Sequence, residues 1–289
     1  MKTSLKLLFL MLTTKTAFAQ DPDKVLARVR YTYTIKTDTL KNGKERTENM
    51  ILFVGKNASL FTSMNKISYE RSEDQKNLAR SISRAGMGSG VPTAVKIDRS
   101  AGEWLTKTNY LFFNKEKKMI TKEEIIGTSY LIEEAIPEIN WKITKDTATF
   151  SGLACQKATA TYEDKNWTAW FAPSLPFQSG PWKLQGLPGL IVDAFDENKA
   201  VQFEFSGFEK ASEGDFVRAN DIRKRPNAVA GDINTVDVGM GLDVAGAYFD
   251  NTILLSTYRT AKTTRKEYDR LKAAYQKDPR GFSKAQYGF

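Results

Sequence analysis

The chain has 289 residues, of which 43 are Lys or Arg and 34 are Asp or Glu, with one Cys and no His. Without His, it cannot build a Ser-His-Asp or Cys-His nucleophile pair or an imidazole metal site. A single Cys excludes internal disulfides and Cys-clustered zinc or iron–sulfur centres. The hydrophobic share of 41% is typical of a globular chain. We therefore expect a folded protein that holds no metal and no cofactor.

Residues 1–19 have the pattern of a secretory signal peptide. Lys2 and Lys6 supply a positive start, residues 7–12 form an apolar run, and a small-x-small cleavage site ends at Ala19. The run is shorter than the roughly 20 residues of a transmembrane helix, and no later segment is long and apolar enough to span a bilayer. A buried N-terminal helix is the alternative. We expect cleavage after Ala19 and an exported protein, periplasmic or extracellular, without a transmembrane segment.

The mature chain begins with a clear strand. Alternating apolar and polar residues over 27–36 have the period of a half-buried strand. A turn at Asn42-Gly43 and a hairpin over 48–54 and 58–63 follow. Further short strands are predicted at 108–113, 117–121, 127–132, 139–144, 154–163, 166–172, 188–195 and 200–208. Short polar connections favour antiparallel pairing, and about ten strands favour a curved sheet or half-barrel over a flat one.

The C-terminal part combines a long loop or insertion at 211–250 with a helix over 264–277. Thr264 and Glu267 have the spacing of a capping box, and Tyr268, Leu271 and Tyr275 form one helical stripe. Asp278-Pro279 is expected to end the helix. We therefore predict one mainly β (α+β) domain over 20–289, a curved antiparallel sheet or half-barrel with a C-terminal helix.

One segment resembles a known family. Residues 186–191 read Gly-Leu-Pro-Gly-Leu-Ile, and Trp141, Cys155-Gln156-Lys157-Ala158, Trp170-Phe171 and Gly180-Pro181 precede them. The chain is similar over about 140–208 to the GLPGLI family, which is named after this hexapeptide. The resemblance implies an exported β-rich domain of Bacteroidota-type Gram-negative bacteria. It supplies no catalytic residue.

The hexapeptide, made of Gly186, Leu187, Pro188, Gly189, Leu190 and Ile191, also has a structural interpretation. Pro188 suits the second position of a β-turn, and Gly189 suits a positive φ at the third. Gly186 is expected to allow a close approach of backbone or ring. The apolar run over 190–192 predicts a strand that is buried on both faces.

Aromatic residues gather just before this motif. Trp167, Trp170, Phe171 and Trp182 are either the folding core or one wall of an apolar ligand groove. We take them as the candidate ligand-binding residues. The groove hypothesis predicts an apolar cavity beneath Trp170 and Trp182.

Reactive groups are few. The lone thiol of Cys155 has apolar neighbours, which favour a buried hydrophobe over a reactive thiol. Adjacent strand residues Glu133 and Glu134 point to opposite faces and make a poor catalytic pair. Asp193 and Asp196 are candidates to meet at a strand end, where a solvated turn is the favoured alternative. No catalytic residue is assigned.

The sequence therefore predicts a non-enzymatic periplasmic protein that binds or carries an apolar or lipid-like ligand. The alternative is an accessory or scaffold subunit of a cell-envelope complex with a protein partner. A carboxylate-based hydrolase ranks third. The net charge is +9, but basic residues are dispersed, and the densest cluster, Arg223-Lys224-Arg225, has no interleaved aromatic residue, so we expect no nucleic-acid partner. The oligomeric state stays open.

Overall fold

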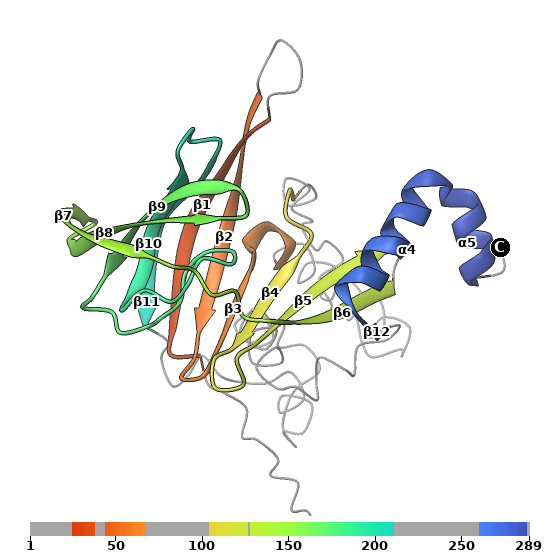
Figure 1. Ribbon diagram of the computed structural model, residues 1–289, viewed down its shortest axis with the longest axis horizontal. Helices are drawn as coiled ribbons and strands as arrows, with labels where there is room; N and C mark the ends of the chain where they lie inside the picture. Colours follow the sequence, from red (N-terminus) through yellow and green to blue (C-terminus); the bar gives the residue numbers. More distant parts are fainter. Residues whose placement is uncertain (1–24, 38–43, 68–103, 127, 211–259, 288–289) are drawn as a thin grey trace, which may run out of the picture.

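A computed structural model describes residues 25–37, 44–67, 104–126, 128–210 and 260–287. Twelve strands form one sheet, with two helices at its C-terminal end (Figure 1). The elements are β1 (Ala27–Thr37), β2 (Lys44–Val54), β3 (Ala58–Ser63), β4 (Asn109–Phe113), β5 (Lys118–Ile125), β6 (Thr128–Ala135), β7 (Lys142–Phe150), β8 (Leu153–Tyr162), β9 (Lys165–Ala172), β10 (Leu190–Asp196), β11 (Val201–Lys210), β12 (Thr260–Thr263), α4 (Arg265–Lys277) and α5 (Pro279–Tyr287).

The sheet is open and almost wholly antiparallel. Its strand order is β12-β6-β5-β4-β3-β2-β1-β11-β10-β9-β8-β7, so β12 and β7 are the edges. Every pairing is antiparallel except the parallel one between β12 and β6. The prediction of a mainly β fold with antiparallel pairing is confirmed. Short connections, such as those between β4, β5 and β6, let successive strands return beside one another.

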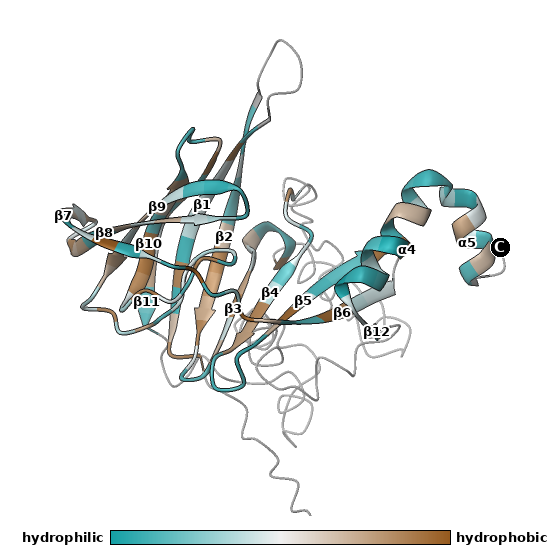
Figure 2. Ribbon diagram, in the orientation of Figure 1, coloured by the Kyte–Doolittle hydropathy of each residue, from teal (hydrophilic) through white to brown (hydrophobic). Residues whose placement is uncertain are grey.

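Two apolar clusters use the two faces of the central strands. The larger cluster takes Val29 and Tyr31 from β1, Leu52 from β2 and Phe61 from β3, and we call this side the core face. The second cluster, on the opposite face, takes the alternate residues of β2 and β3, including Phe53 and Leu60, together with residues of β4, β5 and β6. All six residues of β3 are buried as a result. Figure 2 shows hydrophobic residues concentrated on the central strands, whereas α4 and α5 are mainly hydrophilic.

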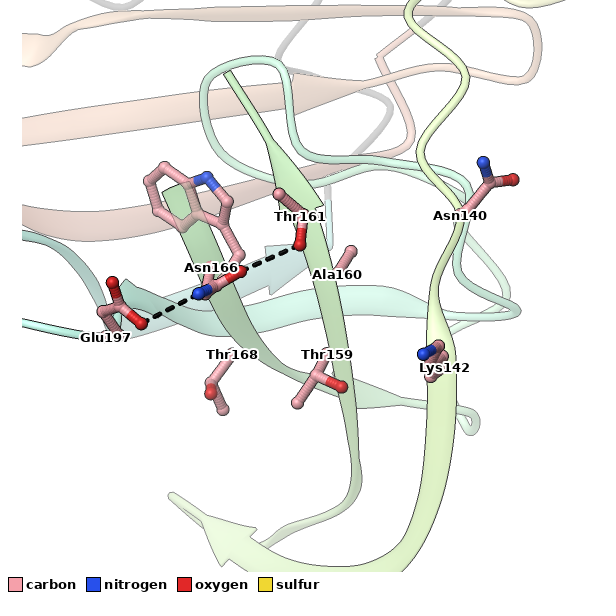
Figure 3. A pocket seen from close by; sticks show the side chains of 9 residues that line it. Asn140, Lys142, Thr159, Ala160, Thr161, Asn166, Thr168 and Glu197 are labelled. Carbon is pink, nitrogen blue, oxygen red and sulfur yellow. Dashed lines mark hydrogen bonds between the residues drawn. The ribbon is translucent and has the colours of Figure 1, made fainter. Parts of the chain in front are cut away.

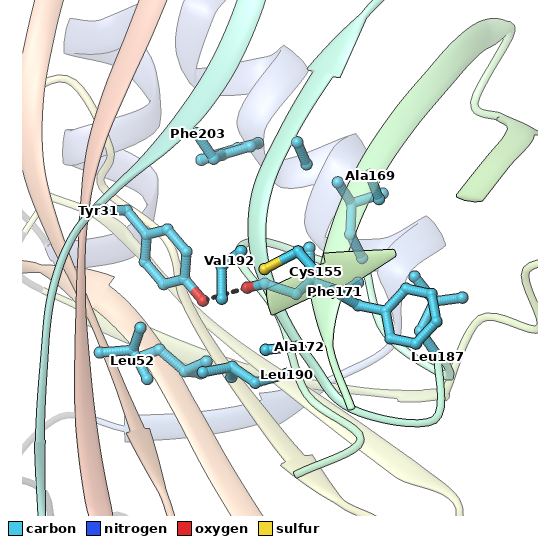
Figure 4. Packing of buried hydrophobic residues seen from close by; sticks show 14 of the residues in the cluster. Tyr31, Leu52, Cys155, Ala169, Phe171, Ala172, Leu187, Leu190, Val192 and Phe203 are labelled. Atoms are coloured by element: carbon cyan, nitrogen blue, oxygen red, sulfur yellow. Dashed lines mark hydrogen bonds between the residues drawn. The ribbon is translucent and has the colours of Figure 1, made fainter. Parts of the chain in front are cut away.

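The first half of strand β10 does not pair with its neighbour β11. The two strands pair only at Ala194 with Phe203 and Phe195 with Gln202. Before these pairs, β10 has an irregularity between Ile191 and Asp193 in its pairing with β9. The phenol of Tyr31 on β1 reaches across and donates a hydrogen bond to the Ile191 carbonyl at 2.6 Å (Figure 4). Residues of β10 therefore pack against the core face of β1, two strands away.

The connection from β9 to β10, residues 173–189, lies across the core face. The indole nitrogen of Trp182 donates to the Tyr110 hydroxyl on β4 at 3.2 Å. The indole nitrogen of Trp141 donates to the Gln185 carbonyl at 2.8 Å. These bonds tie one loop to segments that are far apart in the strand order.

Helix α4 packs against the sheet at the end formed by β12 and β6. Thr264 is its N-cap and accepts a hydrogen bond from the Glu267 backbone nitrogen at 3.3 Å. The Glu267 carboxylate binds Arg270 at 2.7 and 2.9 Å, so only half of the predicted capping box forms. Tyr268 is buried against Tyr130, and Leu271 and Tyr275 pack on the same cluster, as the predicted stripe requires.

The chain continues as a helix after Asp278, which the sequence analysis missed. Pro279 ends α4 but begins α5, because proline is well suited to the first position of a helix. The predicted signal peptide at 1–19, the turn at Asn42-Gly43 and the loop at 211–250 lie outside the described residues. Among the described residues, no helix is long and apolar enough to cross a membrane.

Candidate functional site

Strand alternation separates the four aromatic residues that were predicted to bind a ligand. Trp167 and Phe171 are buried on the core face, with exposed fractions of 2% and 1%. Trp170, one residue before Phe171, points away from these two rings and is half-buried, and it packs at the margin of the same core cluster. Its ring lies 5.6 Å from that of Phe150. Trp170 and Phe171 therefore do not line the same surface.

The loop between β9 and β10 places the ring of Trp182 next to that of Trp167. Their ring centroids are 5.6 Å apart, and further contacts extend the set in both directions. Tyr162 lies 5.7 Å from Trp182, Phe203 lies 6.4 Å from Trp167, and Tyr33 stacks on Phe203 at 5.1 Å. We call this set the aromatic array; its members are Tyr33, Tyr110, Tyr162, Trp167, Trp182 and Phe203.

The array has a buried centre and open ends. Trp167 and Phe203 are buried, whereas the tyrosines and Trp182 are half-buried. Trp167 fills the space beneath Trp182, so an apolar ligand would lie on the array rather than under it. The sequence analysis missed four members of the array as site residues, because strand periodicity marks them only as core positions. They are Tyr33, Tyr110, Tyr162 and Phe203.

Trp182 adopts a backbone conformation that bulky residues rarely take. Its φ is +55°, in the left-handed region. Its indole N–H bonds Tyr110, and the Lys183 ammonium lies 5.4 Å from its ring centroid. Burial raises the pKa of Tyr110 to about 12, although the hydrogen bond from Trp182 lowers it, so this phenol is neutral at pH 7. Strain of this kind persists only where the surrounding contacts hold it.

A buried carboxylate lies at the Tyr33 end of the array. Glu48 is directly opposite Tyr33 in the β1–β2 register and is 3% exposed. One of its oxygens accepts hydrogen bonds from the backbone nitrogens of Leu105 at 3.1 Å and Thr106 at 2.8 Å. After burial, the charge of Glu48 is the second cause that raises the pKa of Tyr33. Through these two hydrogen bonds, Glu48 holds the backbone of residues 105–106 beside the array.

Both glycines of the hexapeptide have a positive φ, as predicted for Gly189, whereas the close approach predicted for Gly186 occurs at Gly189. Gly186 has a φ of +90° with open space around it, whereas a Cβ on Gly189 would lie 2.4 Å from the Ala172 carbonyl oxygen. Gly189 therefore provides the close approach and Gly186 the left-handed backbone. Leu187 is buried, and the 190–192 run is buried throughout, as predicted. The motif packs as part of the core.

Cys155 is a free, buried thiol with an exposed fraction of 2%. Its sulfur lies 3.4 Å from the Leu153 carbonyl oxygen, and its neighbours in the core include Val192 and Phe171 (Figure 4). Burial raises the pKa of this thiol and so disfavours the reactive thiolate. The prediction of a small buried hydrophobe is confirmed.

The acidic candidates are engaged in structural contacts. Glu133 pairs with Lys118 at 2.8 Å, and Glu134 pairs with Arg265 at 2.9 Å. Because neighbours on a strand point to opposite faces, these two glutamates do not converge.

The carboxylate of Asp196 belongs to the turn between β10 and β11. It accepts hydrogen bonds from the backbone nitrogens of Ala200 at 2.7 Å and Val201 at 3.1 Å, and from the Lys165 ammonium at 3.0 Å. The turn alternative that the sequence analysis favoured therefore accounts for Asp196. Within the described ranges, no group of three or more acidic or Cys side chains forms a metal site.

Comparisons with known proteins give a partial family match. Residues 156–193 match a family model described as "Protein of unknown function (Porph_ging)". This range contains the hexapeptide and the four aromatic residues that were predicted to bind a ligand, and it covers less than half of the chain. No curated protein matches the chain.

Two solved structures are similar to the chain at 10% sequence identity. They are "Structure of PNGF-II in P21 space group", with a TM-score of 0.48, and "Structure of PNGF-II in C2 space group", with a TM-score of 0.49. Each match covers 85% of this chain and 32% of the other, so the chain spans about a third of their length.

Proposed function

We propose that this chain is an exported binding protein that carries an apolar or lipid-like ligand against the aromatic array. The observation that carries the proposal is the continuity of the rings from Tyr162 to Tyr33, with half-buried members at both ends. Half-buried aromatic rings supply a large apolar contact area at a small loss of side-chain entropy. The strained backbone of Trp182 fixes one of these rings at the open side.

Three further features belong to the same proposal. The signal-peptide pattern at 1–19 supports export, and the hexapeptide at 186–191 supports membership of the GLPGLI family. A sheet that curls toward a half-barrel is supported by the contact between Tyr31 and Ile191, because two non-adjacent strands approach each other across the core face.

Native mass spectrometry of the mature chain, purified from a periplasm without detergent, tests the proposal. We expect a reproducible extra mass that organic solvent removes. Trp182→Ala is expected to abolish this mass, because the variant removes the central half-buried ring. Trp170→Ala is the matched control, because the ring of Trp170 contacts Phe150, which is outside the array, and it is expected to retain the mass.

A bare protein mass, or equal loss in both tryptophan variants, would contradict ligand carriage on the array. The alternative of an accessory subunit in an envelope complex would then predict a protein partner in an envelope pull-down. Trp182→Ala leaves the buried Trp167 in place, so its folded state can be verified by tryptophan fluorescence and urea unfolding before the comparison is made.

A further inference from the structure

A second concave site lies over β8 and β9, and Trp167 of the aromatic array is one of its lining residues. It is a pocket of 490 Å³, within the size range of small-molecule sites (Figure 3). Its lining residues are Asn140, Lys142, Thr159, Ala160, Thr161, Asn166, Trp167, Thr168 and Glu197. Most of the lining side chains are hydroxyls and amides, with one ammonium and one carboxylate.

The strand register places these polar groups in two rows. Lys142 on β7 pairs with Thr159 on β8, which pairs with Thr168 on β9. In the next row, Thr161 pairs with Asn166, and the backbone nitrogen of Glu197 donates to the Asn166 carbonyl at 2.9 Å. Residues directly opposite each other have their Cβ atoms about 5 Å apart, so both rows share one surface.

The two charges lie at opposite ends of the pocket. Lys142 comes from the edge strand and Glu197 from the turn after β10, and Figure 3 shows them on opposite sides of the lining residues. Three strand spacings of about 4.8 Å separate their backbones. An extended peptide covers roughly 3.4 Å per residue, so a chain of about three residues spans most of this distance.

The carboxylate of Glu197 is oriented before any ligand binds. The Asn166 amide nitrogen donates to one Glu197 oxygen at 2.9 Å, and the Thr161 hydroxyl donates to the Asn166 amide oxygen at 2.8 Å. This chain of hydrogen bonds fixes the direction of the carboxylate and leaves it further acceptor capacity, since an ionised carboxylate has about four lone-pair sites. A fixed acceptor reduces the entropy lost on binding.

We propose that this pocket binds a short peptide with free termini, independently of the apolar ligand on the array. Glu197 binds the terminal ammonium group, and Lys142 binds the terminal carboxylate. The hydroxyls of Thr159 and Thr168 and the Asn140 amide bond the peptide groups between them, because each offers both donor and acceptor atoms. Trp167 is 2% exposed and presents no open face for a sugar ring, which favours a peptide over a saccharide.

Isothermal titration calorimetry on the whole mature chain tests the site with trialanine as the probe. We expect the free peptide to bind, and N-acetylation or C-amidation to weaken binding by about fivefold each, the effect of one partly exposed ion pair. Glu197→Gln is expected to weaken the free peptide to the same extent and to leave the acetylated peptide unaffected. Lys142→Gln is expected to weaken binding of the free peptide to the same extent and to leave binding of the amidated peptide unaffected.

Glu45→Gln is the matched control, because Glu45 is an exposed strand carboxylate that pairs with Lys36 at 3.7 Å away from the pocket. It is expected to change neither titration. Equal affinity for trialanine with free ends and with both ends blocked would overturn the proposal. So would the absence of peptide binding at millimolar concentration, or binding of maltotriose in place of trialanine. If Trp182→Ala lost the ligand on the array, the affinity of the pocket for trialanine would stay the same, so the two proposals can fail separately.

Discussion

The phenol of Tyr31 and the backbone carbonyl of Ile191 form a 2.6 Å hydrogen bond that spans β11. It lies where β10 has separated from β11, whose pairing with β10 begins only at Ala194. Tyr31 is fully buried, and burial raises its pKa well above the usual value for a tyrosine, with the charge of Asp193 adding to the effect. The neutral phenol therefore acts as a permanent donor that holds β10 against β1.

Replacing this donor tests how much the contact stabilises the sheet. Tyr31→Phe leaves a buried carbonyl without this partner, so we expect the free energy of unfolding to fall by about 1–3 kcal/mol. Urea unfolding measures the change. Tyr162→Phe is the control, because its hydroxyl meets Glu163 at 3.3 Å in an exposed position, and its effect is expected to stay within about 0.5 kcal/mol. Equal losses in the two variants would contradict this role of Tyr31.

The hexapeptide glycines have different structural requirements, and alanine substitutions distinguish them. Gly189→Ala places a methyl group 2.4 Å from the Ala172 carbonyl oxygen, so the chain must shift. We expect the free energy of unfolding to fall by about 3 kcal/mol, within the range of overpacked sites. Gly186→Ala is expected to lower it by about 1 kcal/mol, because its cost is the left-handed backbone alone.

Gly207→Ala provides the control for both glycine variants. A Cβ at Gly207 meets nothing within 4 Å, and its backbone is not left-handed. Its effect on urea unfolding is expected to be small. A Gly189→Ala variant as stable as Gly207→Ala would show that the close approach to Ala172 does not constrain the motif.

Asp193 makes the stability depend on pH. Burial, followed by the charge of Glu204, raises its pKa from 3.8 to about 6, although Lys199 lowers it. The folded state therefore binds this proton more tightly than the unfolded state, and the contribution of Asp193 to stability is lost as pH rises from about 4 to about 6. Asp193→Asn is expected to raise the free energy of unfolding at pH 7 by about 1–2 kcal/mol.

Urea unfolding of Asp193→Asn and the native chain at pH 4 and pH 7 measures this effect. We expect the two proteins to differ in free energy of unfolding at pH 7 and to differ less at pH 4, where the Asp193 carboxyl of the folded native chain is largely protonated. Asp146→Asn, at an exposed position that pairs with Lys157 at 3.5 Å, should follow the native profile. A constant gap between Asp193→Asn and the native chain at both pH values would argue against titration of Asp193.

Arg265 docks α4 on the sheet through two carboxylates. Its guanidinium lies 2.7 Å from Glu123 and 2.9 Å from Glu134, and it donates to the Thr121 hydroxyl at 2.8 Å. Arg265→Met removes the nearest cation from the largely buried Glu123 and leaves it with Lys272 at 3.5 Å and the Tyr268 hydroxyl. We expect a loss of about 1–3 kcal/mol and faster amide hydrogen exchange in α4.

Arg270→Met is the control for the helix, because Arg270 pairs with Glu267 on the exposed surface. Ion pairs between fully exposed side chains contribute little to stability, so little change is expected. If both arginine variants exchanged alike in α4, the contact with Glu123 and Glu134 would not be what docks the helix.

Local pattern predicted most strands and the first C-terminal helix. Alternation over 27–36 predicted β1, and the spacing of Thr264 with the Tyr268 stripe predicted α4, because both depend only on residues near in sequence. The edge strand β7 runs on to Phe150, six residues beyond its predicted end. The side chains of β7 are mostly exposed and do not alternate clearly between apolar and polar, because this edge strand pairs with β8 alone.

The sequence by itself determined most of the strands, the buried thiol and the run of tryptophans, since these follow from composition and short-range spacing. It did not predict β12, which pairs with the distant β6. Only the tertiary structure decided that Trp167 joins Trp182, Tyr33 and Phe203 while Trp170 contacts Phe150 outside the array. It also placed the close approach of the hexapeptide at Gly189 instead of Gly186 and gathered Lys142 and Glu197 around one pocket. The physical reason is that strand register and loop path are set by contacts between residues far apart in the chain, and no local pattern encodes which distant residues will meet.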